Sequence, residues 1–237
     1  MSGCRRPDGR PAAAALLGLA LLLPVTGGCR GPDANHRTGH HSHHVHDFSD
    51  AERWARVFDD PGRDRWQRPN EVISIGAIGR GMVVVDIGAG TGYFVPHLCA
   101  AVGPRGRVIA TDIEPELIEH MQRRFAAAGL STAEAKMTPP GDPLLPEGGV
   151  DRILIVNTWH HIAERIAYGA KLLRALRPGG QVIIVDYTLE SPQGPPKEHR
   201  LPASWIEEEL RDAGFSTHVP LESLPHQFIV IGVRPEA

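Results

Sequence analysis

The residues of this chain that could perform chemistry stand at the ends of short apolar runs. Asp86 closes the β-branched run over 83–85, and a glycine then follows at every second position: Gly88, Gly90 and Gly92. An apolar run that stops at an acid and opens into glycines predicts a buried strand, a sharp turn and then a helix. Glycine lets a ligand approach the backbone closely, and the free amides at a helix start can donate hydrogen bonds to it. The segment therefore predicts a site for a nucleotide-type cofactor.

The spacing of these glycines discriminates between cofactors. Nicotinamide and flavin sites carry the pattern G-x-G-x-x-G, whereas this loop reads G-x-G-x-G. No Gly-Lys-Ser or Gly-Lys-Thr follows, which argues against a phosphate-binding P-loop. With its leading acid, D-x-G-x-G-x-G resembles motif I of the class I S-adenosylmethionine-dependent methyltransferases. The run Leu-Arg-Pro-Gly-Gly at 176–180 is also frequent in that family, and the resemblance covers residues 70–234.

A second acid stands where such a site needs one. The run from Arg107 to Asp112 reads as a strand that ends in a carboxylate, twenty positions after Gly92. A carboxylate at that place can accept hydrogen bonds from both ribose hydroxyls of a bound nucleoside. An amphipathic helix is predicted to follow, from Glu114 to about Ala128.

The resemblance implies a role for each residue of the site. The amides around Gly88 and Gly90 would meet the methionine part of S-adenosylmethionine, Asp112 the ribose, and Asp142 the adenine amine. Asp86 would organise the loop through water or through the ammonium group of the cofactor. The complete set expected to bind the cofactor is Asp86, Gly88, Ala89, Gly90, Gly92, Asp112, Ile113, Asp142 and Asn157.

Two adjacent histidines are candidates for the general base. His160 and His161 follow the strand predicted over 151–157, where the family often places groups that face the substrate. Imidazole can accept a proton from a hydroxyl or an amine near neutral pH. One of the two is expected to point inward and the other away, and His161 could instead cap the next helix. Asp186 and Tyr187, after the next strand, are further pocket candidates.

Strand and helix signals alternate along the domain, which predicts a doubly wound α/β fold with a mostly parallel sheet. A helix ending at 180 precedes a strand over 181–186, a helix covers 207–213, and an antiparallel strand over 228–233 comes last. Such sheets bind ligands at the carboxyl ends of their strands, where the strand order reverses. The acids and glycines above all fall at that edge.

Composition sets the outer limits of function. The chain has 237 residues, 41% of them hydrophobic, and a net charge of −3. This length allows one substantial core, and the charge gives no electrostatic footprint for nucleic acid. With nucleic acid excluded, the resemblance to the methyltransferases implies a small-molecule substrate as the partner.

The first 28 residues resemble a bacterial lipoprotein signal. Three arginines precede a short apolar run over 12–23, and Thr-Gly-Gly leads directly to Cys29. A run of this length is too short to span a bilayer but fits a secretory signal. We expect a protein of the cell envelope whose membrane contact is a lipid on Cys29. A misassigned start codon or an uncleaved tail remain alternatives, and without a working signal the protein would be cytoplasmic.

Two further segments precede the domain predicted over 70–237. Residues 29–49 are a polar linker with six histidines that could bind metal or form a solvated tether. Residues 50–69 predict a short helix, a break at Pro61 and a second turn before Pro69. By resemblance, this segment would lie over the crevice as a lid.

Two functions follow from these observations. The first is an S-adenosylmethionine-dependent methyltransferase that acts on a small-molecule or lipid-like acceptor. The alternative is an exported lipoprotein with a non-catalytic methyltransferase-like domain and a metal-binding histidine arm. The intact acids and glycines of the cofactor loop favour the first.

Overall fold

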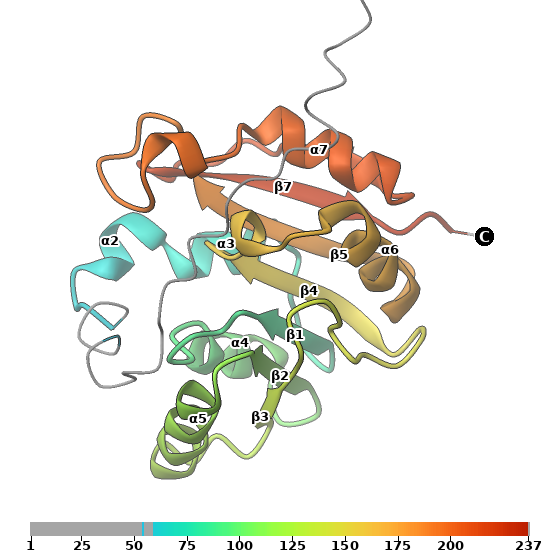
Figure 1. Cartoon of the computed structure of the whole chain (residues 1–237). Coiled ribbons are helices and arrows are strands. Elements are labelled where there is room, and N and C mark those ends of the chain that lie inside the picture. The colour runs from blue at the N-terminus through green and yellow to red at the C-terminus, as the bar shows by residue number, and fades with distance from the viewer. Residues whose placement is uncertain (1–53, 55–58, 237) are drawn as a thin grey trace, which may run out of the picture. The chain divides into compact units, whose positions relative to one another are not determined.

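The computed structural model describes Trp54 and residues 59–236 (Figure 1). The predicted signal segment, the lipid-anchor residue Cys29, the histidine-rich linker and most of the first half of the predicted lid lie outside these residues. Within them, no helix is both long and apolar enough to cross a membrane. In the same part of the chain, no three His, Cys, Asp or Glu side chains gather closely enough to hold a metal ion.

A seven-stranded sheet forms the centre of the described domain, in the order β3-β2-β1-β4-β5-β7-β6. The first five strands in that order are mutually parallel, whereas β7 runs antiparallel to both β5 and β6. This arrangement confirms the doubly wound, mostly parallel fold with an antiparallel C-terminal strand. The strands are β1 (Val83–Ile87), β2 (Arg107–Asp112), β3 (Ala133–Met137), β4 (Val150–Val156), β5 (Leu176–Tyr187), β6 (Ser216–His218) and β7 (Gln227–Val233).

Helices cover both faces of this sheet (Figure 1). Proline occupies the first turn of three of them, where its fixed φ favours the helix and its missing N–H costs no bond. The helices are α2 (Arg63–Gln67), α3 (Pro69–Ile75), α4 (Val95–Val102), α5 (Pro115–Ala127), α6 (Arg165–Ala175) and α7 (Ala203–Asp212), with short 3₁₀ turns η2 (Trp159–His161) and η3 (Lys197–His199).

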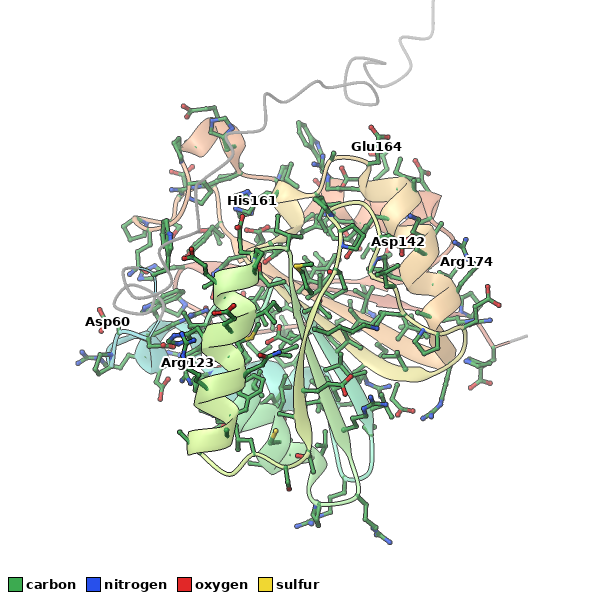
Figure 2. All side chains as sticks on the ribbon, turned by 60° about the horizontal axis from the view of Figure 1, so that its bottom comes forward. Asp60, Arg123, Asp142, His161, Glu164 and Arg174 are labelled. Carbon is green, nitrogen blue, oxygen red and sulfur yellow. The ribbon has the colours of Figure 1, made fainter. Side chains whose placement is uncertain are left out.

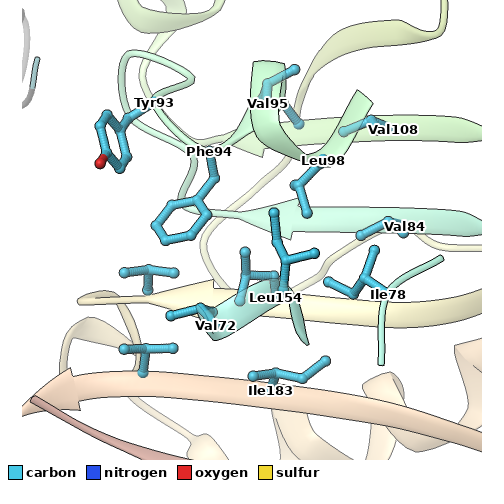
Figure 3. Packing of buried hydrophobic residues seen from close by; sticks show 14 of the residues in the cluster. Val72, Ile78, Val84, Tyr93, Phe94, Val95, Leu98, Val108, Leu154 and Ile183 are labelled. Atoms are coloured by element: carbon cyan, nitrogen blue, oxygen red, sulfur yellow. The ribbon is translucent and has the colours of Figure 1, made fainter. Parts of the chain in front are cut away.

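The strands alternate their side chains between two apolar cores. On one face, α3, α4 and α5 pack on residues such as Val84, Leu154 and Ile183 (Figure 3). On the other face, α6 and α7 pack on the intervening residues, among them Val85 and Ile153. Because successive strand residues point to opposite faces, one apolar run supplies both cores.

The predicted boundary between α6 and β5 is wrong, and α7 begins at Ala203 and not at 207. We expected the helix before β5 to reach 180 and the strand to begin at 181, but α6 ends at Ala175 and β5 begins at Leu176. Pro178 has no amide hydrogen to donate within a helix. Leu176 instead pairs with Val150 of β4, and the register shifts before Arg152 pairs with Gln181. This extension leaves the opposite, ligand-facing end of the strand unchanged.

The strand order reverses between β1 and β4. Strand β1 pairs with β2 on one side and with β4 on the other. The sheet is therefore extended in one direction by β2 and β3 and in the other direction by β4 and β5. Open parallel sheets bind ligands beyond the carboxyl ends of their strands at this point. The antiparallel β7 begins at the same edge, since Gln227 pairs with Tyr187.

Candidate functional site

The glycine loop after β1 is held in a shape that larger residues cannot adopt. Gly88 has a φ of 67°, and a Cβ built on it would lie 2.4 Å from the side chain of Thr158. Gly92 has a φ of 79°, and its Cβ would lie 2.9 Å from the ring of Phe125 on α5. Positive φ and close neighbours together require glycine at both positions. The amide of Ala89 is satisfied by the carbonyl of Thr111, 2.9 Å away, which ties the loop to β2.

Asp112 ends β2 beside this loop. Its carboxylate accepts hydrogen bonds from the amides of Gly90 (2.9 Å), Ile113 (2.8 Å) and Glu114 (3.2 Å). Burial raises the pKa of Asp112, and these three amide bonds lower it again. The structure therefore brings together the glycine loop and the acid expected to hold a ribose.

Asp86 lies at the end of β1 and is only 3% exposed. No side chain or amide among the described residues donates a hydrogen bond to its carboxylate. Burial raises the pKa of Asp86 to about 7, the Arg63 guanidinium opposes that rise, and the neighbouring Asp112 adds to it. A buried carboxylate without a donor is unfavourable unless a ligand supplies one. An ammonium group, such as that of a methionyl moiety, would do so.

Exposed apolar side chains lie beside Asp112. Ile113 directly follows it, and Met137 at the end of β3 is its register partner. Their residues are 48% and 55% exposed, although large apolar residues in this domain are mostly buried. Apolar surface next to a polar anchor is typical of pockets that hold a planar heterocycle. These two side chains fit the adenine of the expected cofactor.

His160 and Asp186 form a buried pair across the ends of β4 and β5. Nδ1 of His160 lies 2.9 and 3.0 Å from the two carboxylate oxygens of Asp186, and the side chains are only 5% and 4% exposed. The amide of Tyr187 donates to the same carboxylate at 2.8 Å. His161 on η2 is exposed (Figure 2), but its ring centre lies 4.2 Å from that of His160, so the two rings are in contact and do not point apart. His160 is the one that reaches the sheet edge.

Asn157 and Asp142, also expected at the cofactor, differ in their placement. Asn157 follows β4 at the sheet edge with a φ of 54°, and its side chain bonds to Tyr187 and Gln227. Asp142 is 44% exposed and bonds to Lys171 of α6 at 2.9 Å and to the amide of Leu144 (Figure 2). The structure brings Asn157 to the group and directs Asp142 towards α6.

The segment that carries α2 lies against the glycine loop. Asp59 accepts hydrogen bonds from Thr91 in the loop (3.0 Å) and from Arg124 on α5 (2.8 Å). The hydroxyl of Tyr93 donates to Asp64. These contacts place the second half of the predicted lid on the cofactor loop.

Two residues of the site were not expected from the sequence. Gln67 on α2 and Gln227 on β7 are fully buried, and their amides bond to each other at 2.6 Å. The Arg63 guanidinium lies 3.9 Å from the centre of the Tyr93 ring, an arrangement that stabilises a buried cation. A glutamine in an otherwise apolar strand, as at the start of β7, was the available signal for Gln227.

Known proteins resemble this domain in sequence and in structure. Residues 84–180 match a family described as a methyltransferase domain. A ubiquinone/menaquinone biosynthesis C-methyltransferase, UbiE, of Saccharophagus degradans is 26% identical over 122 residues, which are 49% of this chain and 47% of the relative. The nocamycin O-methyltransferase of Saccharothrix syringae is 28% identical over 102 residues, 44% of this chain and 37% of the relative. The chain thus spans less than half the length of these curated relatives.

A solved structure extends the similarity over a whole protein. The S-adenosylmethionine-dependent methyltransferase from Aquifex aeolicus superposes with a TM-score of 0.73 at 28% identity, over 80% of this chain and 99% of that one. The family match and this structure agree on S-adenosylmethionine as the cofactor.

Proposed function

We propose that this chain, which carries a class I S-adenosylmethionine-dependent methyltransferase domain, methylates a small-molecule acceptor whose proton is removed by His160. The observation that carries this proposal is the His160–Asp186 pair at the carboxyl edge of the sheet, where the cofactor acids also lie. When bound, S-adenosylmethionine supplies an electrophilic methyl group on a sulfonium sulfur. The residues of the chain must hold the cofactor, prepare the acceptor and exclude water.

The residues that would hold the cofactor fit its parts. The Asp86 carboxylate receives no hydrogen bond from residue 54 or residues 59–236 and suits an ammonium group, and Asp112 stands where ribose hydroxyls can donate to it. Ile113 and Met137 offer an exposed apolar surface for the adenine. A ribose hydroxyl would compete with the Gly90 amide for Asp112, and that amide would then be available to the ligand.

The Asp186 carboxylate fixes the state of the His160 ring. Because a carboxylate accepts hydrogen bonds, it holds the imidazole hydrogen on Nδ1 and leaves the lone pair on Nε2. Nε2 is then the atom that accepts a proton from the acceptor. Asp186 also faces the positive charge that forms on the ring when Nε2 takes up that proton.

Such a base is required when the acceptor atom is a neutral oxygen or an acidic carbon. Removing the proton leaves an electron pair on a C–H carbon and makes the lone pair of an O–H oxygen more nucleophilic, and that pair forms the new bond to the methyl group. The relatives named above are a C-methyltransferase and an O-methyltransferase, and both kinds of transfer release one proton. The proposed acceptor therefore carries an ionisable O–H or C–H group. An amine, which is already nucleophilic, is a less suitable acceptor for a site with such a base.

The segment with α2 would exclude water from this reaction. It is tied to the cofactor loop through Thr91 and Tyr93 and to α5 through Arg124. Covering the site keeps its charges in a low dielectric and keeps water from competing with the acceptor.

The test is methyl transfer by the full-length chain. S-adenosylmethionine with a labelled methyl group is incubated with the protein and a panel of phenols, enols and amines, and the label in each product is counted. The proposal predicts label on O–H or C–H acceptors and its loss in His160→Gln. Transfer to amines alone, with His160→Gln fully active, would contradict it.

A further inference from the structure

A line of buried and half-buried polar side chains crosses the sheet edge from α2 to Tyr187. Arg63 Nη2 donates to Gln67 Oε1 at 3.1 Å, and Gln67 Nε2 donates to Gln227 Oε1 at 2.6 Å. Gln227 Nε2 donates to Asn157 Oδ1 at 2.6 Å, and Asn157 Nδ2 donates to the Tyr187 hydroxyl oxygen at 3.2 Å. The line joins segments 160 residues apart, and its two glutamines are fully buried.

The first member of this line fixes the orientation of all the others. Arginine can only donate hydrogen bonds, so Gln67 must present its oxygen to Arg63 and its NH₂ group to Gln227. For the same reason, Gln227 presents its oxygen to Gln67 and its NH₂ group to Asn157, and Asn157 presents its oxygen to Gln227 and its NH₂ group to Tyr187. Burial enforces the order, since a reversed amide would place two donors or two acceptors face to face without water.

The consequence appears at Tyr187. Its hydroxyl oxygen accepts the last bond of the line, so its hydrogen remains to be donated elsewhere. Within residue 54 and residues 59–236, that hydroxyl donates to no other group. Burial raises the pKa of Tyr187, which keeps the hydroxyl protonated and able to donate.

The ring of Tyr187 is also held in place. Trp66 stacks against it with ring centres 6.3 Å apart. A Cβ on Gly194 would lie only 2.5 Å from the Tyr187 ring, so that loop backbone packs directly against the aromatic side chain. Tyr187 directly follows Asp186, the carboxylate that holds His160.

We propose that Tyr187 determines acceptor specificity by donating a hydrogen bond to an oxygen on the atom next to the one that loses its proton. This inference rests on the proposed function and names its substrate class: a planar acceptor with a hydroxyl or carbonyl oxygen beside the ionisable group. Gln227 and Asn157 are positioning residues, because they act only through the direction that they impose on Tyr187.

A pair of coloured probes that differ by one oxygen tests this. 4-Nitrocatechol carries a second hydroxyl beside the ionisable one, whereas 4-nitrophenol lacks it. Both are titrated by absorbance into the full-length protein saturated with S-adenosylhomocysteine. The unaltered protein should prefer 4-nitrocatechol by about tenfold, the contribution of one hydrogen bond in a buried site.

Three variants separate the effect of hydrogen-bond direction on the probe preference from a general loss of structure. Tyr187→Phe removes the hydroxyl and should bind both probes equally. Gln227→Glu keeps the shape of the side chain, but a carboxylate only accepts hydrogen bonds, so Asn157 must donate to it and turn its own oxygen towards Tyr187. The Tyr187 hydroxyl then donates to Asn157 and not to the probe, and this variant should lose the preference for 4-nitrocatechol. Tyr168→Phe is the matched control, because the hydroxyl of this buried tyrosine on α6 makes no hydrogen bond among the described residues, and it should keep the preference.

The outcomes distinguish this inference from the proposed function. Failure of the folded, unaltered protein to bind S-adenosylhomocysteine would contradict the proposed function itself. If it binds S-adenosylhomocysteine but shows no preference between the probes, the inference alone is wrong. A preference that persists in Tyr187→Phe, shown to be folded by circular dichroism, would overturn it equally, even if Gln227→Glu does not fold.

Discussion

Replacing Asp86 by asparagine is expected to stabilise the unliganded protein and to weaken cofactor binding. The carboxylate is 3% exposed and receives no hydrogen bond from the described residues. Burial raises its pKa from 3.8 to about 7, against the favourable influence of Arg63. The folded state therefore holds a proton on Asp86 over a pH range in which the unfolded chain has lost it.

The sign and size of the effect follow from this difference. Because the folded pKa is the higher one, stability falls as pH rises from about 4 to about 7 and is lowest above that range. The interval between 3.8 and about 7 corresponds to about 4 kcal/mol of folding free energy once the group is ionised. Asparagine has nearly the same shape and no charge, so the variant lacks this pH-dependent loss.

The assay is urea unfolding of both proteins between about pH 4 and about pH 8. The stability of Asp86→Asn relative to the unaltered protein should grow by about 4 kcal/mol over that range. An effect of the asparagine side chain on the free energy of unfolding that does not depend on pH cancels in this comparison. Asp142→Asn is the control, since Asp142 lies at the surface with a lowered pKa and should show no such gain at high pH. A difference that does not change with pH would refute the reasoning.

Three further predictions concern the base, the loop and the core. His160→Gln should lower turnover about 10²- to 10⁴-fold while calorimetry shows unchanged cofactor affinity, and equal loss of both would contradict its role as a base. Gly88→Ala should lose cofactor binding and melt at a lower temperature, since its Cβ would meet Thr158 at 2.4 Å and φ is 67°; an unchanged melting curve would refute this. Glu209→Gln should lose about 3–5 kcal/mol in urea unfolding, because it leaves the Arg165 guanidinium, whose side chain is only 15% exposed, without its carboxylate, and a loss under about 1 kcal/mol would argue against that pair.

Much of the fold could be predicted because its signals are local. The apolar runs at β1, β2 and β4 and their terminal acids mark strand ends directly, and the chain order then places those ends at one edge. The glycine spacing and Asp112 predicted, for the same reason, two features that the structure brings into contact at that edge. The pairing of His160 with Asp186 needed the registers of β4 and β5, which the sequence does not contain.

The rest depends on contacts between distant segments. Gln67 and Gln227 lie 160 residues apart in the sequence, and no residue next to either of them indicates that the two side chains bond to each other. Asp142 was expected at the adenine from its loop position, and in the structure its carboxylate bonds to Lys171 of α6. No local sequence pattern indicates that ion pair. The signal segment, the anchor at Cys29 and the histidine-rich linker stay predictions.

The most direct test of the central claim is calorimetric titration of the full-length protein with S-adenosylmethionine. The account predicts one-to-one binding with a dissociation constant on the order of micromolar, lost in a folded Asp112→Ala variant that removes the acceptor for the ribose hydroxyls. Absence of binding by the folded, unaltered protein would contradict the account, and so would binding that Asp112→Ala leaves unchanged.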